Sequence, residues 1–114
     1  MRILVIGGTG FLGYHATREL SARDHQVTAI GLPPLSPQLD FPEEVEVRLL
    51  DLGRLEDEQL RQLLRGFDAV VFAAGADDRA APPSPAAPFF YEANVRSCVR
   101  LTAAAMRSGV ERLV

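Results

Sequence analysis

Three glycines, Gly7, Gly10 and Gly13, stand three residues apart near the start of the chain. Gly7 would permit a sharp exit from a strand, Gly10 would let the backbone approach a pyrophosphate, and Gly13 would let a helix pack closely. The first turn of that helix, at Phe11 and Leu12, would offer unpaired N–H groups and the positive end of its dipole. The spacing therefore predicts a phosphate-binding loop, and a turn that merely joins strand to helix is the alternative.

The residues on either side of the glycines supply the context that such a loop needs. The continuous apolar run at 2–6 indicates a strand buried on both faces, as in a parallel sheet. From 11 to 22, apolar or small side chains recur at Leu12, Ala16 and Leu20 with charged residues between them, which is helical spacing. The sequence thus predicts a strand, a glycine turn and a helix in succession.

The rest of the chain alternates between strand and helix patterns. Proline-rich stretches at 31–42 and 76–88 interrupt it and are predicted loops. The alternation predicts an α/β fold, a doubly wound parallel sheet of the Rossmann type. The chain stops at the start of the fifth strand, so we expect 1–114 to be one domain, the N-terminal part of a larger protein. Further strands are predicted at 25–31, 44–50, 68–75 and 110–114, and further helices at 51–67 and 89–109.

The helix predicted at 89–109 has a small and apolar face and an arginine-bearing face. Arg96, Arg100 and Arg107 lie on the outer face, which we expect to be solvated. The side chains expected to face inward are Val95, Cys98, Leu101, Thr102, Ala105 and Met106.

Composition and charge narrow the possible partners. The chain has 47% hydrophobic residues, 12 basic and 15 acidic residues and a net charge of -3, with no basic block that would suggest a nucleic acid or an anionic membrane. No apolar run approaches the roughly 20 residues of a membrane span. The single cysteine, Cys98, suits a reducing compartment as a small apolar filler, so we expect a cytoplasmic protein. All basic residues are arginine, and lysine is absent.

Metal chemistry finds no support in the sequence. No group of histidine, cysteine and carboxylate residues has the spacing of a metal site. Asp77 and Asp78 fall in a predicted loop, where solvation is the simpler interpretation. His15 on the first helix is interpreted as a polar or interface residue. We therefore assign no metal ligand.

The ordered series of motifs resembles the short-chain dehydrogenase/reductase superfamily. The segment "ILVIGGTGFLG" at 3–13 resembles the first turn of its extended type, which includes nucleotide-sugar epimerases and dehydratases. "LLDL" at 49–52 and "DAVVFAAG" at 68–75 are similar to the ends of that family's third and fourth strands. "YEANVRSCVRLTAAAMRSGVERLV" at 91–114 resembles the helix and strand that follow. The match spans the whole chain in the family's order.

The resemblance implies roles for individual residues. Asp51 would hydrogen-bond the adenine amino group, and the small residues at 73–75 would lie under the ribose and nicotinamide, although small side chains also fit tight packing. Asn94 stands at the family's asparagine, which hydrogen-bonds the backbone of the fourth strand. The cofactor-binding positions so implied are Gly7, Gly10, Phe11, Leu12, Gly13, Gly31, Asp51, Leu52, Ala73, Ala74, Gly75 and Asn94.

Two departures from the family pattern matter. The acidic residue that would hold the ribose 2′-hydroxyl of NAD is replaced by Gly31, and no arginine between 31 and 42 could clamp the extra phosphate of NADP. The cofactor is therefore NAD or NADP, with the preference open. The family's Tyr-x-x-x-Lys pair is also absent; Tyr14 and Arg18 imitate its spacing, but arginine is a poor proton relay. We assign no catalytic residue within the chain.

Two functions remain open at this point. The resemblance implies the dinucleotide-binding portion of an epimerase, dehydratase or reductase that acts on a nucleotide sugar or a related hydroxyl or carbonyl compound. It also implies a homodimer formed through the helix at 89–109. The alternative is a non-catalytic nucleotide-sensing or protein-interaction module, which Gly31 and the proline-rich loops favour.

Overall fold

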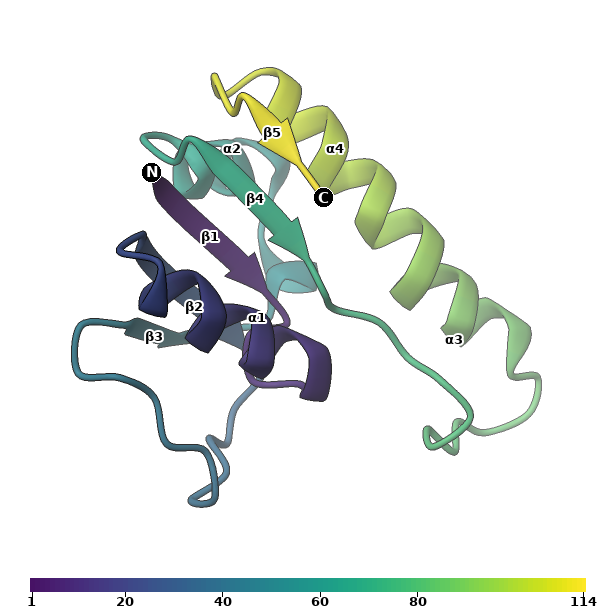
Figure 1. Ribbon diagram of the computed structural model, residues 1–114. Helices are drawn as coiled ribbons and strands as arrows, with labels where there is room; N and C mark the ends of the chain where they lie inside the picture. The colour runs from purple at the N-terminus through teal and green to yellow at the C-terminus, as the bar shows by residue number, and fades with distance from the viewer.

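The computed structural model describes all residues, 1–114, and contains a five-stranded sheet with the order β3-β2-β1-β4-β5 (Figure 1). Every neighbouring pair of strands is parallel. The order and direction confirm the predicted Rossmann-type sheet. The strands are β1 (Arg2–Ile6), β2 (Gln26–Gly31), β3 (Glu46–Leu49), β4 (Ala69–Phe72) and β5 (Arg112–Leu113).

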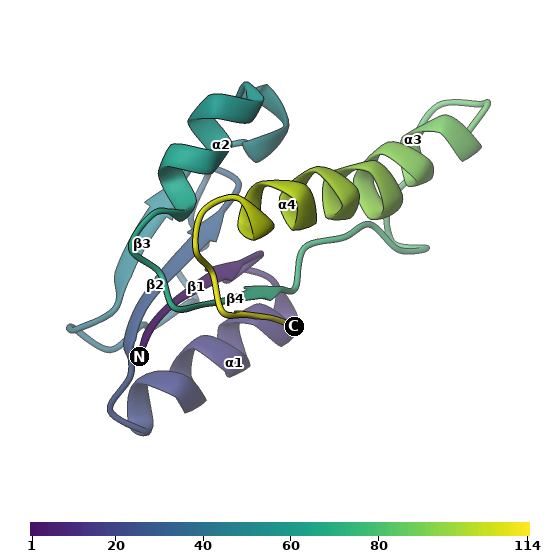
Figure 2. The same ribbon diagram turned by 90° about the horizontal axis from the view of Figure 1, so that it is seen from above.

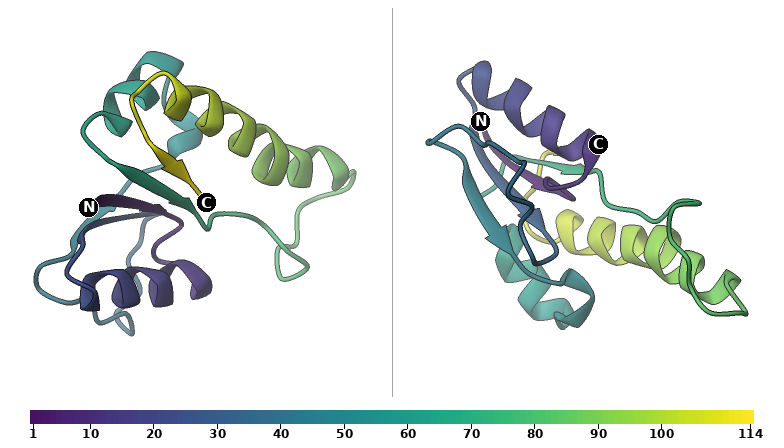
Figure 3. Two further views of the ribbon diagram at one scale, coloured as in Figure 1. Left: turned by 45° about the horizontal axis from the view of Figure 1, so that its top comes forward. Right: turned by 90° about the horizontal axis from the view of Figure 1, so that it is seen from below.

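Helices cover both faces of this sheet. The first helix lies against one face, and the helices that precede and follow β4 lie against the other (Figures 2 and 3). No helix joins β2 to β3, as the prolines of that connection predict. The helical elements are α1 (Phe11–Ala22), the short η1 (Leu52–Arg54), α2 (Asp57–Leu64), α3 (Ala87–Tyr91), η2 (Glu92–Arg96) and α4 (Ser97–Met106).

The central strand β1 is buried on both faces. Leu4 and Ile6 pack into the core between the sheet and the pair α2 and α4. Ile3 and Val5 belong to the second core, which includes Leu20 of α1. Because successive side chains of a strand point to opposite faces, one apolar run serves both cores. The prediction of a doubly covered central strand is confirmed.

The helix α1 packs through Leu20, as the sequence pattern indicates, and through a row of small residues that the pattern does not indicate. Gly13, Thr17 and Ser21 are buried, whereas Leu12 is 72% exposed. A Cβ atom at Gly13 would collide with the carbonyl oxygen of Gly7, so the helix lies too close to the loop for a larger residue. The close approach that was predicted for Gly13 is confirmed, and it explains why the small face is the buried one.

The long helix differs from its predicted form in phase. It is continuous from 87 to 106 but contains the π-helical turn η2. Leu101 and Ala105 are buried as predicted, while Val95 is 44% and Met106 is 81% exposed. The buried face of α4 is formed by Leu101, Ala104 and Ala105, and Val95 lies off this face, so its predicted inward position is wrong. Met106 is rotated by about 100° from Ala105 around the helix, which turns it away from the sheet.

Arg100 is also placed differently from the prediction. It is only partly solvated: its side chain is 28% exposed and is held by α2 and the residues before it. Its Nη2 donates to the carbonyl oxygen of Leu55 at 2.7 Å and to Oδ1 of Asp57 at 3.0 Å. Arg100 therefore ties α4 to the start of α2, a contact between residues more than 40 positions apart that helical periodicity does not reveal.

Candidate functional site

A groove of about 590 Å³ lies at the carboxyl ends of β1, β2 and β4. The chain crosses from β1 to β2 on one side and reaches β4 on the other, so the groove marks the point where the strand order reverses. Ligands of open parallel sheets bind at this point. The groove is lined by eight of the predicted cofactor-binding residues, namely Gly7, Gly10, Gly31, Asp51, Leu52, Ala73, Ala74 and Gly75.

The glycine loop is folded tightly against the end of β4. Gly7 has a φ of 81°, a conformation that other residues adopt with strain. A Cβ atom there would lie 2.6 Å from the backbone nitrogen of Ala74. The amide of Gly10 donates to the carbonyl oxygen of Gly7 at 2.9 Å, which closes the turn. Gly7 thus has the sharp exit from the strand that the sequence predicts.

Gly10 is a glycine that the protein's own packing does not require. Its φ of -82° and ψ of 173° are open to any residue. A Cβ atom there would approach only the carbonyl oxygen of Gly7, at 3.3 Å. The bare backbone at this position therefore keeps free the space in front of α1, where a pyrophosphate would need it. The residues present at this loop are therefore compatible with a bound dinucleotide.

The amino end of α1 has the features of an anion-binding helix terminus. No side chain caps it, and its first turn carries no acidic residue. The side chains of Phe11 and Leu12 are each 72% exposed and do not line the groove. Their contribution to binding would come from backbone N–H groups of the first turn, which have no partner inside a helix.

The end of β2 presents no carboxylate. Gly31 is buried there, and its carbonyl oxygen accepts a hydrogen bond from Leu50 at 2.9 Å. The side chain of Thr9 fills the place where a side chain of residue 31 would begin. Thr9 also lines the groove, although the sequence analysis does not single it out. The feature of the sequence that could have identified Thr9 is its position inside the glycine loop.

Asp51 follows β3 at the rim of the groove. Its Oδ1 accepts a hydrogen bond from the amide of Gly53 at 2.9 Å, which caps η1. Its Oδ2 lies 3.7 Å from Nε of Arg54, which is highly exposed. The carboxylate is thus fixed at the groove, and the contact with an adenine amino group stays a prediction.

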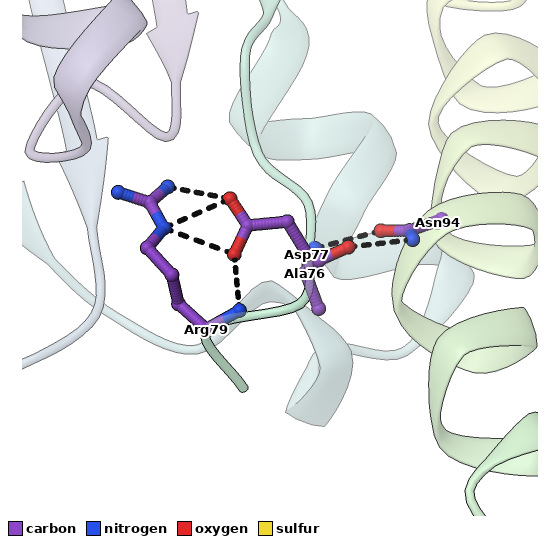
Figure 4. A network of polar contacts seen from close by, with 4 residues as sticks. All are labelled: Ala76, Asp77, Arg79 and Asn94. Atoms are coloured by element: carbon purple, nitrogen blue, oxygen red, sulfur yellow. Dashed lines mark hydrogen bonds and ion pairs between the residues drawn. The ribbon is translucent and has the colours of Figure 1, made fainter. Parts of the chain in front are cut away.

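Asn94 fixes the backbone that leaves β4 (Figure 4). Its Oδ1 accepts from the amide of Ala76 at 2.7 Å, and its Nδ2 donates to the carbonyl oxygen of the same residue at 2.8 Å. The predicted backbone contact is therefore present, one residue beyond the predicted strand. Asn94 does not line the groove, whereas Ala76 does, so the asparagine acts on the groove through the backbone.

This pair of bonds gives a testable expectation. Asn94→Asp retains the acceptor for the amide of Ala76 but replaces the amide donor with a carboxylate oxygen that repels the carbonyl. We expect it to lower the free energy of unfolding by about 0.5–1.5 kcal/mol, the net contribution of one hydrogen bond. Urea unfolding measures this, with Asn94→Gln as the control that keeps the amide chemistry. An unchanged stability in Asn94→Asp contradicts the assigned role.

Beyond Ala76 the chain forms a charged turn. Nε of Arg79 donates to Oδ1 of Asp77 at 3.0 Å, and the amide of Arg79 donates to the same oxygen at 3.0 Å. These hydrogen bonds lower the pKa of Asp77 below its usual value. Asp77 and Asp78 are both exposed, which agrees with the solvated loop predicted for them.

Tyr14 and Arg18 lie outside the groove and have another role. The hydroxyl of Tyr14 donates to the carbonyl oxygen of Asp40 at 2.9 Å, and Nη1 of Arg18 donates to that hydroxyl at 3.2 Å. The Tyr14 ring also meets Phe41 edge to face. The pair therefore attaches the proline-rich connection to α1. His15 is exposed and lies against the ring of Phe11.

The structure adds two general observations. No group of three or more histidine, cysteine and carboxylate side chains is arranged to hold a metal ion. None of the helices combines the length and apolar character needed to cross a membrane. Other groove residues that sequence reasoning missed include Leu32, Leu50, Ala76 and Arg100.

The chain is similar to proteins of known structure and to a curated yeast protein. A solved structure of MoeE5 with UDP-glucose and NAD is 29% identical, with a TM-score of 0.77 over 99% of this chain and 35% of that one. The UDP-glucose 4-epimerase of Thermus thermophilus, solved with NAD, is 28% identical, with a TM-score of 0.76 over 99% of this chain and 36% of that one. The UPF0659 protein YMR090W of Saccharomyces cerevisiae is 22% identical over 100% of this chain and 49% of its own length.

The chain spans about a third of the length of these solved structures and about half of the yeast protein. Its fold and its glycine loop resemble the NAD(P)-binding domain of the nucleotide-sugar epimerases. The family described as NAD(P)H-binding matches residues 7–114, nearly the whole sequence. This chain is an NAD(P)H-binding domain of that family, within the short-chain dehydrogenase/reductase superfamily.

Proposed function

We propose that this chain forms the cofactor-binding portion of an NAD(P)-dependent epimerase, dehydratase or reductase whose substrate is a nucleotide sugar or a related hydroxyl or carbonyl compound. The observation that carries the proposal is the bare backbone at Gly10 in front of an uncapped helix, within a groove at the reversal point of the sheet. The similarity to structures solved with NAD and UDP-glucose supports the substrate class.

Different residues of the groove would contact different parts of the cofactor. The loop at 7–13 would hold the pyrophosphate through backbone N–H groups, and Asp51 would face the adenine. The small residues at 73–75 would leave room for the nicotinamide ribose, held in place by the contact between Asn94 and Ala76. The bound nicotinamide would supply hydride transfer.

Proton transfer is not among the functions that we propose for these residues. Residues 1–114 contain no lysine and therefore no Tyr-x-x-x-Lys pair. Tyr14 is engaged with Asp40 outside the groove, so it does not replace that pair. We propose that binding and orientation of the cofactor are the contribution of this chain.

Backbone NMR spectra test where the cofactor binds. On addition of NADH, the amide signals of Gly7, Gly10, Leu12 and Ala74 should shift. Signals from the amino ends of the strands, such as those of Gln26 and Asp68, should stay in place and serve as the internal control. Shifts spread evenly over the protein, or absent from the glycine loop, would contradict the proposed site.

We also propose that the chain forms a homodimer through the outer face of its long helix. Tyr91, Val95, Val99 and Met106 follow one another at intervals of four, four and seven residues and are between 44% and 81% exposed. Such a row of apolar side chains on one helix face is typical of a surface that packs against another helix.

If the chain forms this dimer, a charge placed in the row should lower the mass of the particle measured in solution. Val99→Arg introduces a charge into the middle of this row. Because burial of an unpaired charge is costly, the dissociation constant of the dimer should rise at least about tenfold. Sedimentation velocity at several concentrations measures it. Gln62→Arg on α2 adds the same charge away from the row and should leave the association unchanged. A wild-type protein that stays monomeric contradicts the proposal.

A further inference from the structure

The contact between Thr9 and Gly31 is the least expected feature of the groove. A Cβ atom at Gly31 would lie 2.7 Å from Cβ of Thr9 and would overlap both Oγ1 and Cγ2 of that side chain. Gly31 has no left-handed backbone conformation, so the glycine is required by this contact and not by its own φ. The Thr9 side chain therefore occupies the space that a longer residue at 31 would use.

The Thr9 hydroxyl is free to bind a ligand. The hydroxyls of Thr28 and Thr102 bind Glu46 and the carbonyl oxygen of Cys98, whereas that of Thr9 has no hydrogen-bond partner in the protein. Thr9 lines the groove and is only half-buried. A hydroxyl at this place can both donate and accept.

The other groove residues near the end of β2 leave few polar groups to compete with Thr9. Leu32, which directly follows Gly31, is 62% exposed. Leu50 and Leu52 are apolar, and the carboxylate of Asp51 between them already accepts from Gly53. The one basic residue that lines the groove is Arg100, and its guanidinium is held by Asp57 and the carbonyl oxygen of Leu55.

We propose that Thr9 is the specificity-determining residue for the adenosine ribose, and that its hydroxyl replaces the carboxylate that a longer residue 31 would present. This inference rests on the proposed dinucleotide binding. A carboxylate only accepts hydrogen bonds and repels a phosphate, so it selects NADH. The neutral Thr9 hydroxyl accepts a hydrogen bond from a ribose 2′-hydroxyl and donates one to a 2′-phosphate. The groove should consequently bind NADH and NADPH with similar affinity.

Substitutions of Thr9 test the role of its hydroxyl. Calorimetric titration of the wild-type chain should give dissociation constants for NADH and NADPH within about fivefold of each other. Thr9→Val keeps the shape that packs on Gly31 but removes the hydroxyl, and should weaken both cofactors about tenfold. Thr9→Ser is the matched control and should retain binding. The melting temperature of each variant shows that the fold persists.

A double substitution tests the replacement directly. Thr9→Gly combined with Gly31→Asp removes all three Thr9 atoms that a Cβ at 31 would meet and supplies a carboxylate. This double variant should favour NADH over NADPH by at least about tenfold. Binding of both cofactors that is unaffected by Thr9→Val, or a wild-type preference above about tenfold, overturns the role of Thr9 but leaves the proposed function intact. Failure of the wild-type chain to bind either cofactor overturns both.

Discussion

Gly10→Ala is expected to leave the fold intact and to reduce dinucleotide affinity by at least about a hundredfold, or roughly 3 kcal/mol. The backbone at Gly10 is extended and its added methyl group would meet only the carbonyl oxygen of Gly7, at 3.3 Å. The protein therefore tolerates the substitution. The same methyl group would lie in front of α1, where the pyrophosphate must approach the backbone N–H groups.

This separation of folding from binding can be measured on one sample. Thermal unfolding should show a melting temperature within a few degrees of the wild type, because N-cap glycine and alanine differ by about 1 kcal/mol or less. Calorimetric titration with NADH measures the affinity. If Gly10→Ala binds NADH as tightly as the wild type, the pyrophosphate does not lie against this loop.

Gly13→Ala is expected to have the opposite pattern, with the fold itself lost or destabilised by at least about 3 kcal/mol. In the interior of a helix, alanine in place of glycine normally stabilises by about 1 kcal/mol. Here the added Cβ atom would collide with the carbonyl oxygen of Gly7 and would lie 2.9 Å from Cα of Gly8. Both contacts are with backbone atoms, which cannot rotate away.

Urea unfolding followed by circular dichroism measures the stability of this variant. Ala16→Gly, three residues later in the same helix, is the control: it should lose only the helix propensity of about 1 kcal/mol. A Gly13→Ala variant as stable as the wild type would show that α1 does not approach the loop as closely as the structure indicates.

The features that the sequence predicted are those set by neighbouring residues. The apolar run of β1 identified a doubly covered strand, because burial on both faces leaves no alternation in the pattern. The glycines at 7 and 13 identified the turn and the close helix, because each needs a bare backbone for a local reason. The prolines at 31–42 predicted the absence of a crossover helix between β2 and β3.

The features that escaped prediction depend on contacts between distant residues. The choice of Thr17 and Ser21 over Leu12 as the buried face of α1 follows from how closely that helix approaches the loop. The partners of Arg100 lie more than 40 positions away on another helix. The buried face of the long helix is formed by Leu101, Ala104 and Ala105, so the predicted inward positions of Val95 and Met106 are wrong.

At the end of β2, too, one feature could be predicted from the sequence and another depends on a contact between distant residues. The substitution of Gly31 for an acidic residue was visible in the sequence, but its physical cause was not. Only the structure places Thr9 across Gly31 and so explains why no side chain stands there. The interpretation of Gly31 thereby changes from a missing ligand to one half of a packed pair.

Calorimetric titration of the wild-type chain with NADH and with NADPH, beside the same titration of Gly10→Ala, tests the central claim most directly. The wild type should bind at least one of the two cofactors with a dissociation constant below about 1 mM, at one site per chain, and Gly10→Ala should lose that binding while remaining folded. A folded wild-type chain that binds neither cofactor below about 1 mM would contradict the assignment of the groove to a dinucleotide.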